Sequence, residues 1–258
     1  MEWHDEAIVL AVHRHGEHDA RLETLTAEHG RAFGLVKGGL SRRLRSVIQP
    51  GNRLSVTWRA RVEHQLGNFT AEALGAHGLA LARDPGRLLA LTAATALVSA
   101  VLPEREPHRA VYDGLSALIA LVDQCRDGEE DRLAWLTGFI RFEMGLLRDL
   151  GFGLDLESCA ATGTRDDLVY VSPRTGRAVS RAAGRPYHDR LLPLPEFLTS
   201  PGEQAADLAA AAQGLELAGF FLERCLLAPH RRGLPAARQR LALHVAEKVA
   251  AGDAKALE

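Results

Sequence analysis

Residues 6 to about 80 show the short alternation of apolar and polar positions that is typical of β-strands, with glycines between the runs. The runs predict five strands, at Ala7–His13, Arg21–Glu28, Arg31–Lys37, Arg53–Val62 and Phe69–Leu74. Five short strands in so few residues fit a small barrel, whose steep strand coiling explains the glycines. The five-stranded OB barrel is the commonest solution, although other small barrels would give the same pattern.

From Asp84 onward the apolar spacing becomes that of α-helices. Asp84 is a suitable N-cap, Pro85 suits the first helical position, and Pro103 ends the run. Further helices are expected at about His108–Cys125, Glu129–Leu150, 203–227 and 235–250. The helix at Glu129–Leu150 carries its apolar side chains in one stripe, made of Leu133, Leu136, Phe139, Ile140, Met144, Leu147 and Leu150.

An irregular segment, Gly153–Thr199, separates the helices into two groups. Asp167–Ser172 and Arg177–Ser180 within it predict a small hairpin around a Pro- and Gly-containing turn. The predicted fold class is therefore α+β. A five-stranded OB-type β-barrel occupies residues 1–80, and an all-α domain follows over residues 81–258, with a small irregular insertion that carries the hairpin at about residues 153–199.

The composition is that of an ordinary globular protein, with 47% hydrophobic and 25% charged residues among 258. A chain of this length is long for a single hydrophobic core, which favours two domains. The longest nearly uncharged stretch, Leu88–Leu102, is shorter than the about 20 apolar residues of a membrane span, so we expect a buried helix and no membrane contact. The N-terminus lacks the basic and apolar regions of a signal peptide, which predicts a cytoplasmic protein.

Basic residues gather in one part of a chain whose formal net charge is −2. From Arg31 to Arg61 there are eight of them and no Asp or Glu. An arginine-rich solvated surface is the alternative, but such surfaces usually mix both signs. A local positive field attracts phosphate backbones or acidic partner segments. The candidate nucleic-acid-binding residues are Lys37, Arg42, Arg43, Arg45, Arg59 and Arg61.

The sequence offers little for catalysis or metal binding. It has no G-x-S-x-G elbow, no H-E-x-x-H helix and no Walker spacing. His13, His15 and His18 lack a cysteine or paired carboxylate that would complete a tetrahedral metal site. The three cysteines, Cys125, Cys159 and Cys225, form no CxxC pair. We therefore expect a non-catalytic protein without a metal ion or other cofactor.

Several short motifs, in a specific order and spacing, carry a family resemblance. In the first half they are the opening Glu2–Leu10, His15-Gly16-Glu17, the run Gly34–Gly39 and Leu66–Thr70. In the second half they are Phe139–Met144 and Leu146–Leu156. Over about residues 2 to 200 the chain resembles the bacterial RecO recombination mediator family.

The resemblance implies an OB barrel, a helical domain and a protein that binds single- and double-stranded DNA and anneals complementary strands. With RecR, such proteins help to load RecA onto DNA coated by single-strand-binding protein (SSB), without catalysis. An OB groove combines cations that follow the backbone with aromatic rings that stack on bases. Trp58 and Phe69 are the aromatic candidates, although either could belong to the core.

The chain departs from the family at one place. Many relatives hold zinc with two cysteine pairs in the segment between the helices, whereas here Cys159 is followed three residues later by Thr162. A tetrahedral thiolate site cannot form from these residues, so we expect no zinc.

A groove for the acidic, apolar-ended tail of SSB is also expected in the helical domain. Arg132 and Arg109 are the candidate cations, and Leu136 and Phe139 the candidate apolar surface. Two alternatives to the DNA function remain: an RNA-binding OB-fold protein, which would use the same basic barrel, and an adaptor that binds only acidic protein tails.

Overall fold

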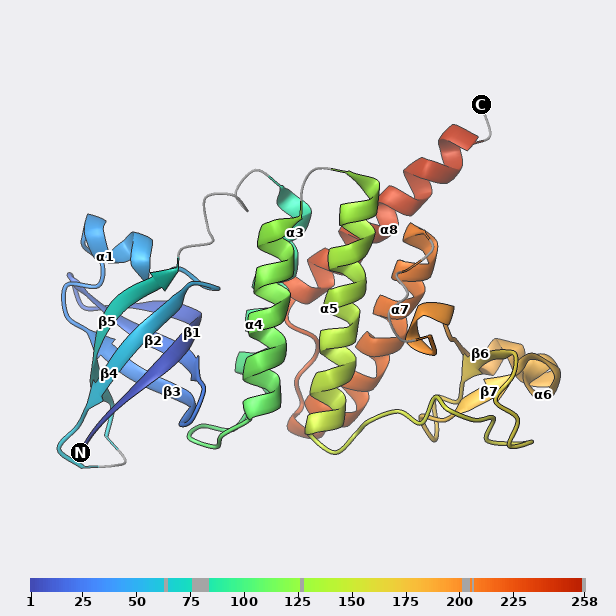
Figure 1. The fold of residues 1–258 in the computed structure, drawn as a ribbon, viewed down its shortest axis with the longest axis horizontal. Helices are drawn as coiled ribbons and strands as arrows, with labels where there is room; N and C mark the ends of the chain where they lie inside the picture. Colours follow the sequence, from blue (N-terminus) through green and yellow to red (C-terminus); the bar gives the residue numbers. More distant parts are fainter. Residues whose placement is uncertain (63–64, 76–83, 126–127, 201–204, 206, 257–258) are drawn as a thin grey trace. The chain divides into compact units, whose positions relative to one another are not determined.

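The computed structural model describes residues 1–62, 65–75, 84–125, 128–200, 205 and 207–256. They form two compact units, Met1–Gln124 and Cys125–Glu258. Among the described residues, the first unit holds a closed barrel and three helices, and the second is mostly helical with a small sheet (Figure 1). A barrel followed by a helical region confirms the predicted α+β class. The predicted domain boundary at residues 80 and 81 lies outside the described residues.

Five strands close the barrel in the order β1-β2-β3-β5-β4. They are β1 (Glu2–His15), β2 (Asp19–Thr26), β3 (Gly30–Val36), β4 (Arg53–Arg59) and β5 (Gly67–Gly75). Neighbouring strands are antiparallel except β3 and β5, which meet in parallel. All five predicted strands are present. The first begins earlier than predicted because Glu2 to Glu6 pair with Ser55 to Arg59 of β4.

Two glycines allow β3 and β5 to meet. A Cβ on Gly67 would lie 2.2 Å from the indole of Trp58, and a Cβ on Gly34 would lie 2.4 Å from the ring of Phe69. Any side chain at these positions would push the strands apart. Trp58 and Phe69, each 4% exposed, fill the barrel core instead.

A short helix, α1 (Arg42–Val47), lies between β3 and β4. The sequence pattern does not predict it, because so short a helix shows no periodicity. The Ser41 hydroxyl caps its start, accepting from the Leu44 amide at 3.4 Å. At its end, the buried Asn52 side chain donates to the Ser46 and Val47 carbonyls at 3.1 and 2.8 Å. Both ends of α1 are therefore fixed to the barrel connections.

Two helices, α3 (Pro85–Val101) and α4 (Arg109–Gln124), complete the first unit. Asp84 caps α3 as predicted, accepting from the Gly86 amide at 2.8 Å, and Pro85 occupies the first turn. The α3 helix ends before Pro103 and packs against β1. On the loop after α3, the Arg105 amide donates to the Arg31 carbonyl in β3 at 2.8 Å.

Three long helices form the core of the second unit: α5 (Glu129–Asp149), α7 (Leu208–Phe221) and α8 (Ala236–Ala256). The stripe predicted on α5 is buried, except that Met144 and Leu150 are partly exposed. The helix predicted at 203–227 starts partly outside the described residues. Its described part is capped by Asp207 and passes into a π-helical turn, η3 (Leu222–Leu227), and a 3-10 turn, η4 (Ala228–His230).

The insertion between α5 and α7 confirms the predicted hairpin. Strands β6 (Leu168–Val171) and β7 (Ala178–Ser180) pair, and β8 (Leu192–Pro193) adds a third strand beside β6. The short helices there are α6 (Arg181–Gly184), η1 (Arg185–Arg190) and η2 (Glu196–Leu198). Across the described ranges, none of the helices has the length and apolar character needed to cross a membrane.

Candidate nucleic-acid interface

The short helix α1 presents its three arginines to solvent. Arg42, Arg43 and Arg45 are exposed, and in the part of the chain that the structure describes none of them has an ion pair. Lys37, also exposed, follows the end of β3. These four side chains are therefore accessible to a ligand, and their role in nucleic-acid binding stays a prediction.

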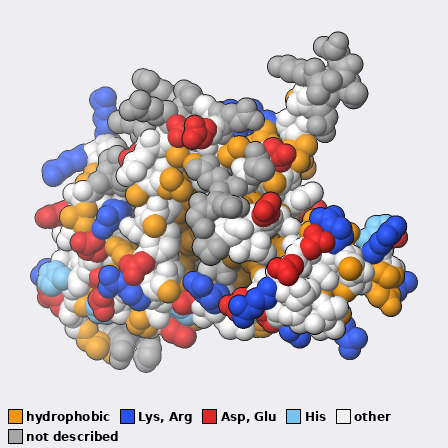
Figure 2. Space-filling view, turned by 45° about the vertical axis from the view of Figure 1, so that its right-hand side comes forward, with side chains coloured by type: hydrophobic (Ala, Val, Ile, Leu, Met, Phe, Trp, Pro, Cys, Tyr) orange, Lys and Arg blue, Asp and Glu red, His pale blue; other side chains and the backbone are white. Residues whose placement is uncertain are grey.

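Other arginines of the basic stretch meet carboxylates from neighbouring strands. Arg59 binds Glu2 at 2.7 Å, Arg53 binds Glu6 at 2.7 Å, and Arg31 binds Glu23 at 2.9 Å. The hydrogen bond and charge of Glu2 raise the pKa of Arg59, and Arg59 lowers the pKa of Glu2. Part of the stretch that has no Asp or Glu in sequence therefore lies against carboxylates from other strands. On the face seen in Figure 2, basic side chains lie among acidic ones.

The predicted DNA-binding residues lie in two groups rather than one. Strand β4 separates them: α1 leads into its start at Arg53, and Arg59 and Arg61 lie at and beyond its end. At about 3.3 Å per residue, the two ends of β4 are roughly 20 Å apart. Arg61 is exposed, and Arg59 keeps a 63% exposed side chain despite its ion pair. A bound strand would have to extend along the barrel to meet both groups.

Neither aromatic candidate is available for stacking on bases. Trp58 and Phe69 point into the barrel core, and the Trp58 indole N–H donates to the Phe33 carbonyl at 3.1 Å. Trp3 and Phe33 are partly exposed aromatic residues nearby, and the Trp3 ring lies between two other rings. The Trp3 ring stacks on His29 with a centroid distance of 4.2 Å and on Trp58 at 5.6 Å.

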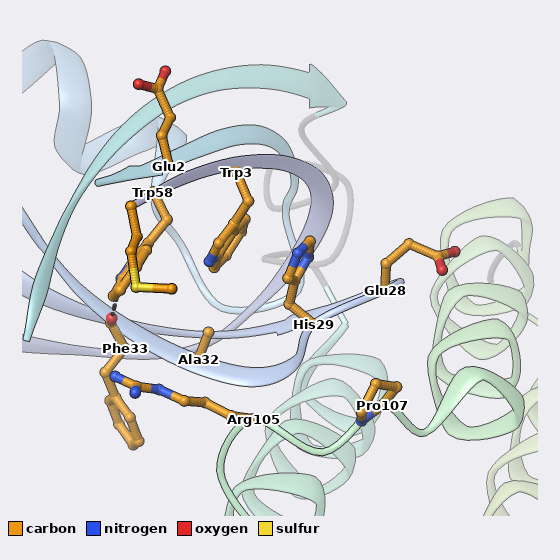
Figure 3. A pocket seen from close by; sticks show the side chains of 10 residues that line it. Glu2, Trp3, Glu28, His29, Ala32, Phe33, Trp58, Arg105 and Pro107 are labelled. Atoms are coloured by element: carbon orange, nitrogen blue, oxygen red, sulfur yellow. Dashed lines mark hydrogen bonds between the residues drawn. The ribbon is translucent and has the colours of Figure 1, made fainter. Parts of the chain in front are cut away.

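This aromatic stack forms a wall of a cavity of about 390 Å³ in the first unit. Figure 3 shows Trp3 and His29 side by side above Ala32, with Arg105 and Pro107 from the α3–α4 loop below. The carboxylates of Glu2 and Glu28 point away from the cavity. The sequence reasoning missed this site, because its walls come from four separate segments of the chain.

Two residues of the cavity are held by specific contacts. His29 Nδ1 lies 2.9 Å from Oδ2 of Asp5, whose side chain is only 5% exposed and also accepts the Glu28 amide at 2.8 Å. Arg105 adopts a left-handed backbone conformation, with φ of 62°. Its guanidinium carbon lies 5.6 Å from the centroid of the Trp58 ring.

The apolar surface predicted for the partner groove is absent at the two residues that were expected to supply it. Leu136 and Phe139 are both 0% exposed, so they offer no apolar surface. Arg109 belongs to the first unit and pairs with Asp113 and Glu28 at 3.0 and 2.9 Å, and these bonds raise its pKa. Arg132 lies on α5 in the second unit, partly exposed and without a side-chain ion pair among the described residues.

The Cys159 side chain is buried in the insertion and hydrogen-bonded to the backbone. Cys159 is 1% exposed, and its sulfur accepts the Ser180 amide at 3.3 Å. Burial raises the pKa of this thiol, while hydrogen bonds from Ser180 and Thr162 lower it, to about 6 overall. Within the described ranges, no group of three or more His, Cys, Asp or Glu side chains is placed to hold a metal ion.

Comparison with known proteins places both halves in one family. The family model described as "Recombination protein O N terminal" matches residues 1–76, and the one described as "Recombination protein O C terminal" matches residues 82–233. Proteins named DNA repair protein RecO are similar along nearly their whole length. That of Rhodospirillum rubrum is 51% identical, over 93% of this chain and 94% of its own.

Two further relatives with the same name extend the similarity. The protein of Caulobacter vibrioides (strain NA1000 / CB15N) is 48% identical over 96% of this chain and 98% of its own. That of Mesorhizobium japonicum is 43% identical over 98% of this chain and 99% of its own. With both family models and these relatives in agreement, the chain belongs to the RecO (recombination protein O) family.

Proposed function

We propose that this chain is a non-catalytic DNA-binding mediator of recombinational repair that works in the cytoplasm. The observation that carries the proposal is helix α1, whose three exposed arginines meet no acidic side chain in the described structure. Helix α1 stands on an OB-type barrel in a chain of the RecO family, whose relatives are named DNA repair proteins. Cations without internal partners release counterions from a phosphate backbone when they bind it.

The proposal includes the finer activities that the family resemblance implies. The chain binds single- and double-stranded DNA, anneals complementary strands and, with RecR, helps to load RecA onto strands coated by SSB. Contacts with phosphates come from Lys37, from α1 and from Arg59 and Arg61 at the far end of β4. These contacts do not depend on base sequence, which suits a protein that acts on any strand.

Arg132 is the proposed contact for the acidic tail of SSB. Its side chain is partly exposed and has no ion pair among the described residues, so a carboxylate can approach it without displacing an internal partner. Arg109 is a weaker candidate, since it would first have to release Glu28 and Asp113. A tail bound at Arg132 would use apolar surface other than Leu136 and Phe139.

The decisive experiment measures DNA binding against salt for a variant of α1. Replacing Arg42, Arg43 and Arg45 with Ala keeps good helix formers in α1 and removes three charges. If each makes one phosphate contact, the slope of log K against log salt on single strands falls by about 2, at about 0.7 per contact. The charge-matched control replaces Arg174, Arg185 and Arg190, which are exposed in the insertion of the second unit.

The control should keep the slope of the parent protein. An unchanged slope in the α1 variant would remove α1 from the interface, and a parent protein that binds no DNA would overturn the proposed function. Competition between matched DNA and RNA oligomers tests the RNA-binding alternative, which predicts preference for the ribose strand. A protein that binds only the SSB tail peptide, with no salt-dependent DNA binding, would be the adaptor.

A further inference from the structure

The cavity beside Trp3 combines a fixed aromatic wall with one planar cation, and its charged rim is neutralised. We propose that it holds a single unpaired nucleobase of a bound DNA strand. This inference rests on the proposed DNA binding and adds to it a pocket that takes one base out of the strand. The pocket lies in the first unit, at the end of β4 that carries Arg59 and Arg61.

The shape of the site suits a flat ring. Trp58, Trp3 and His29 form a continuous stack, with interplanar angles of 12° between the two indoles and 9° between Trp3 and His29. The cavity of about 390 Å³ opens beside this stack. Because the inner ring, Trp58, is anchored in the barrel core by its hydrogen bond to Phe33, the wall is in place before a ligand arrives.

The polar groups that face the cavity match the edge of a base. Asp5 holds Nδ1 of His29, which leaves Nε2 as the ring nitrogen available to a ligand. Arg105 also lines the cavity, with its Nε 3.3 Å from Glu104 and its Nη2 donating to the Gln65 carbonyl at 3.3 Å. Base carbonyls and ring nitrogens accept hydrogen bonds from guanidinium groups. A residue other than glycine at φ of 62° is uncommon, and such strain is concentrated at ligand sites.

The charges around the mouth permit a phosphate-linked ligand to approach. Glu2 is paired with Arg59 at 2.7 Å and Glu28 with Arg109 at 2.9 Å, and both carboxylates point away from the cavity in Figure 3. Next to the cavity, the Phe33 ring carries guanidinium groups at 5.1 and 5.3 Å. The phosphates next to a bound base would therefore meet carboxylates that are already paired with arginines.

An aromatic side chain of a protein partner fits the same volume less well. A hydrocarbon ring offers nothing to Nε2 of His29. Burying that nitrogen without a hydrogen-bond partner is unfavourable. A nucleobase supplies both a flat face and acceptors at its edge, so the chemistry of the cavity favours the base.

The test compares an intact single strand with a strand of the same length and charge in which every base is absent. Stacking of one base corresponds to about 5- to 150-fold in affinity, so the intact strand should bind the full-length protein at least about fivefold more tightly. A third strand, with one base in an otherwise abasic chain, should recover most of that factor. A gain that instead grew equally with each added base would indicate an open stacking surface and overturn the pocket.

Two variants tie the effect to the cavity. Arg105→Gly suits the left-handed backbone while removing the guanidinium, and His29→Ala removes the partly exposed end of the stack. Each should lower the ratio of intact to abasic affinity toward one. Arg174→Ala, an exposed arginine on the hairpin of the second unit, should keep the ratio of the parent.

The outcomes separate this proposal from the function on which it rests. Equal binding of intact and abasic strands by the parent protein overturns the base pocket and leaves DNA binding in place. A ratio that both cavity variants leave at the parent value also overturns the pocket, because the base is then bound elsewhere. Binding of neither strand overturns the DNA function and the pocket together.

Discussion

The buried ion pair between α5 and α8 allows a sharp test of what stabilises the second unit. Arg238 is 1% exposed and Glu143 is 0% exposed. Arg238 Nε lies 2.5 Å from Oε1 of Glu143, and Nη2 lies 2.9 Å from Oε2 and also donates to the Leu215 carbonyl of α7 at 2.7 Å. One guanidinium therefore joins three helices and is the only counter-charge bonded to this carboxylate in the described structure.

Replacing Arg238 with Met keeps much of the side-chain volume but leaves the Glu143 carboxylate buried without its partner. Removing one member of a buried pair destabilises a protein by about 3–5 kcal/mol. For a unit of this size, that loss corresponds to a fall of roughly 6–20 °C in Tm. Replacing both members, with Glu143→Leu added to Arg238→Met, removes the buried charge altogether. Such apolar replacements are neutral or stabilising by about 1–4 kcal/mol, so the double variant should recover most of the loss.

The pH dependence has a definite sign. Burial raises the pKa of Glu143 above its ordinary value of 4.5, although Arg238 opposes the shift. A carboxyl whose folded pKa is raised disfavours folding at high pH, and this penalty disappears as the pH falls toward 4.5. Without Arg238 the penalty is larger, so the stability deficit of Arg238→Met should shrink between pH 8 and pH 5.

Urea unfolding of the parent, both single variants and the double variant gives the coupling energy directly. Circular dichroism follows the loss of helix, and tryptophan fluorescence follows the loss of packing in both units, since Trp3 and Trp58 lie in the first unit and Trp135, 2% exposed on α5, lies in the second. A double variant no more stable than Arg238→Met, or a single variant within about 1 kcal/mol of the parent, would contradict the stabilising role assigned to this pair.

Three further outcomes follow from the structure. Arg132→Ala should weaken binding of an SSB tail peptide by roughly 10- to 100-fold, as expected for a lost charge-assisted hydrogen bond, and should leave DNA binding nearly unchanged; equal binding by variant and parent would move the tail site elsewhere. Elemental analysis should find no stoichiometric zinc, since Cys159 lacks cysteine partners at ligand spacing; one zinc per chain would redirect attention to the N-terminal histidines. Gly67→Ala should lower the free energy of unfolding by about 1–3 kcal/mol or more, measured by chemical denaturation, because its Cβ would lie 2.2 Å from the Trp58 indole. The control Gly145→Ala, in open space on α5, should raise the free energy of unfolding by roughly 0.5–1 kcal/mol. Similar effects of the two changes would refute the role of Gly67 in closing the barrel.

Local patterns predicted most of the fold. Strand alternation located the barrel, and the Asp84-Pro85 pair located the start of α3, because capping depends on neighbours in the chain. The same alternation places Trp58 in phase with Leu54 and Val56, all three buried, so its core position was available from the pattern. Helix α1 could not be predicted from the pattern, because it is too short to show a period and its last carbonyls accept hydrogen bonds from the Asn52 side chain.

At the candidate site, the sequence alone could not predict which arginines are paired with carboxylates. Arg59 is 57 positions from the Glu2 that neutralises it, and the pairing follows from the register of β1 on β4. The absence of Asp and Glu from a strand's own sequence therefore does not predict a positive surface, because its neighbouring strands come from elsewhere in the chain. It is informative for α1, which lies between two strands, because Leu44 and Val47 pack against the barrel while its three arginines are exposed. For that reason the three arginines of α1, rather than the whole basic stretch, are the residues on which the DNA-binding proposal depends.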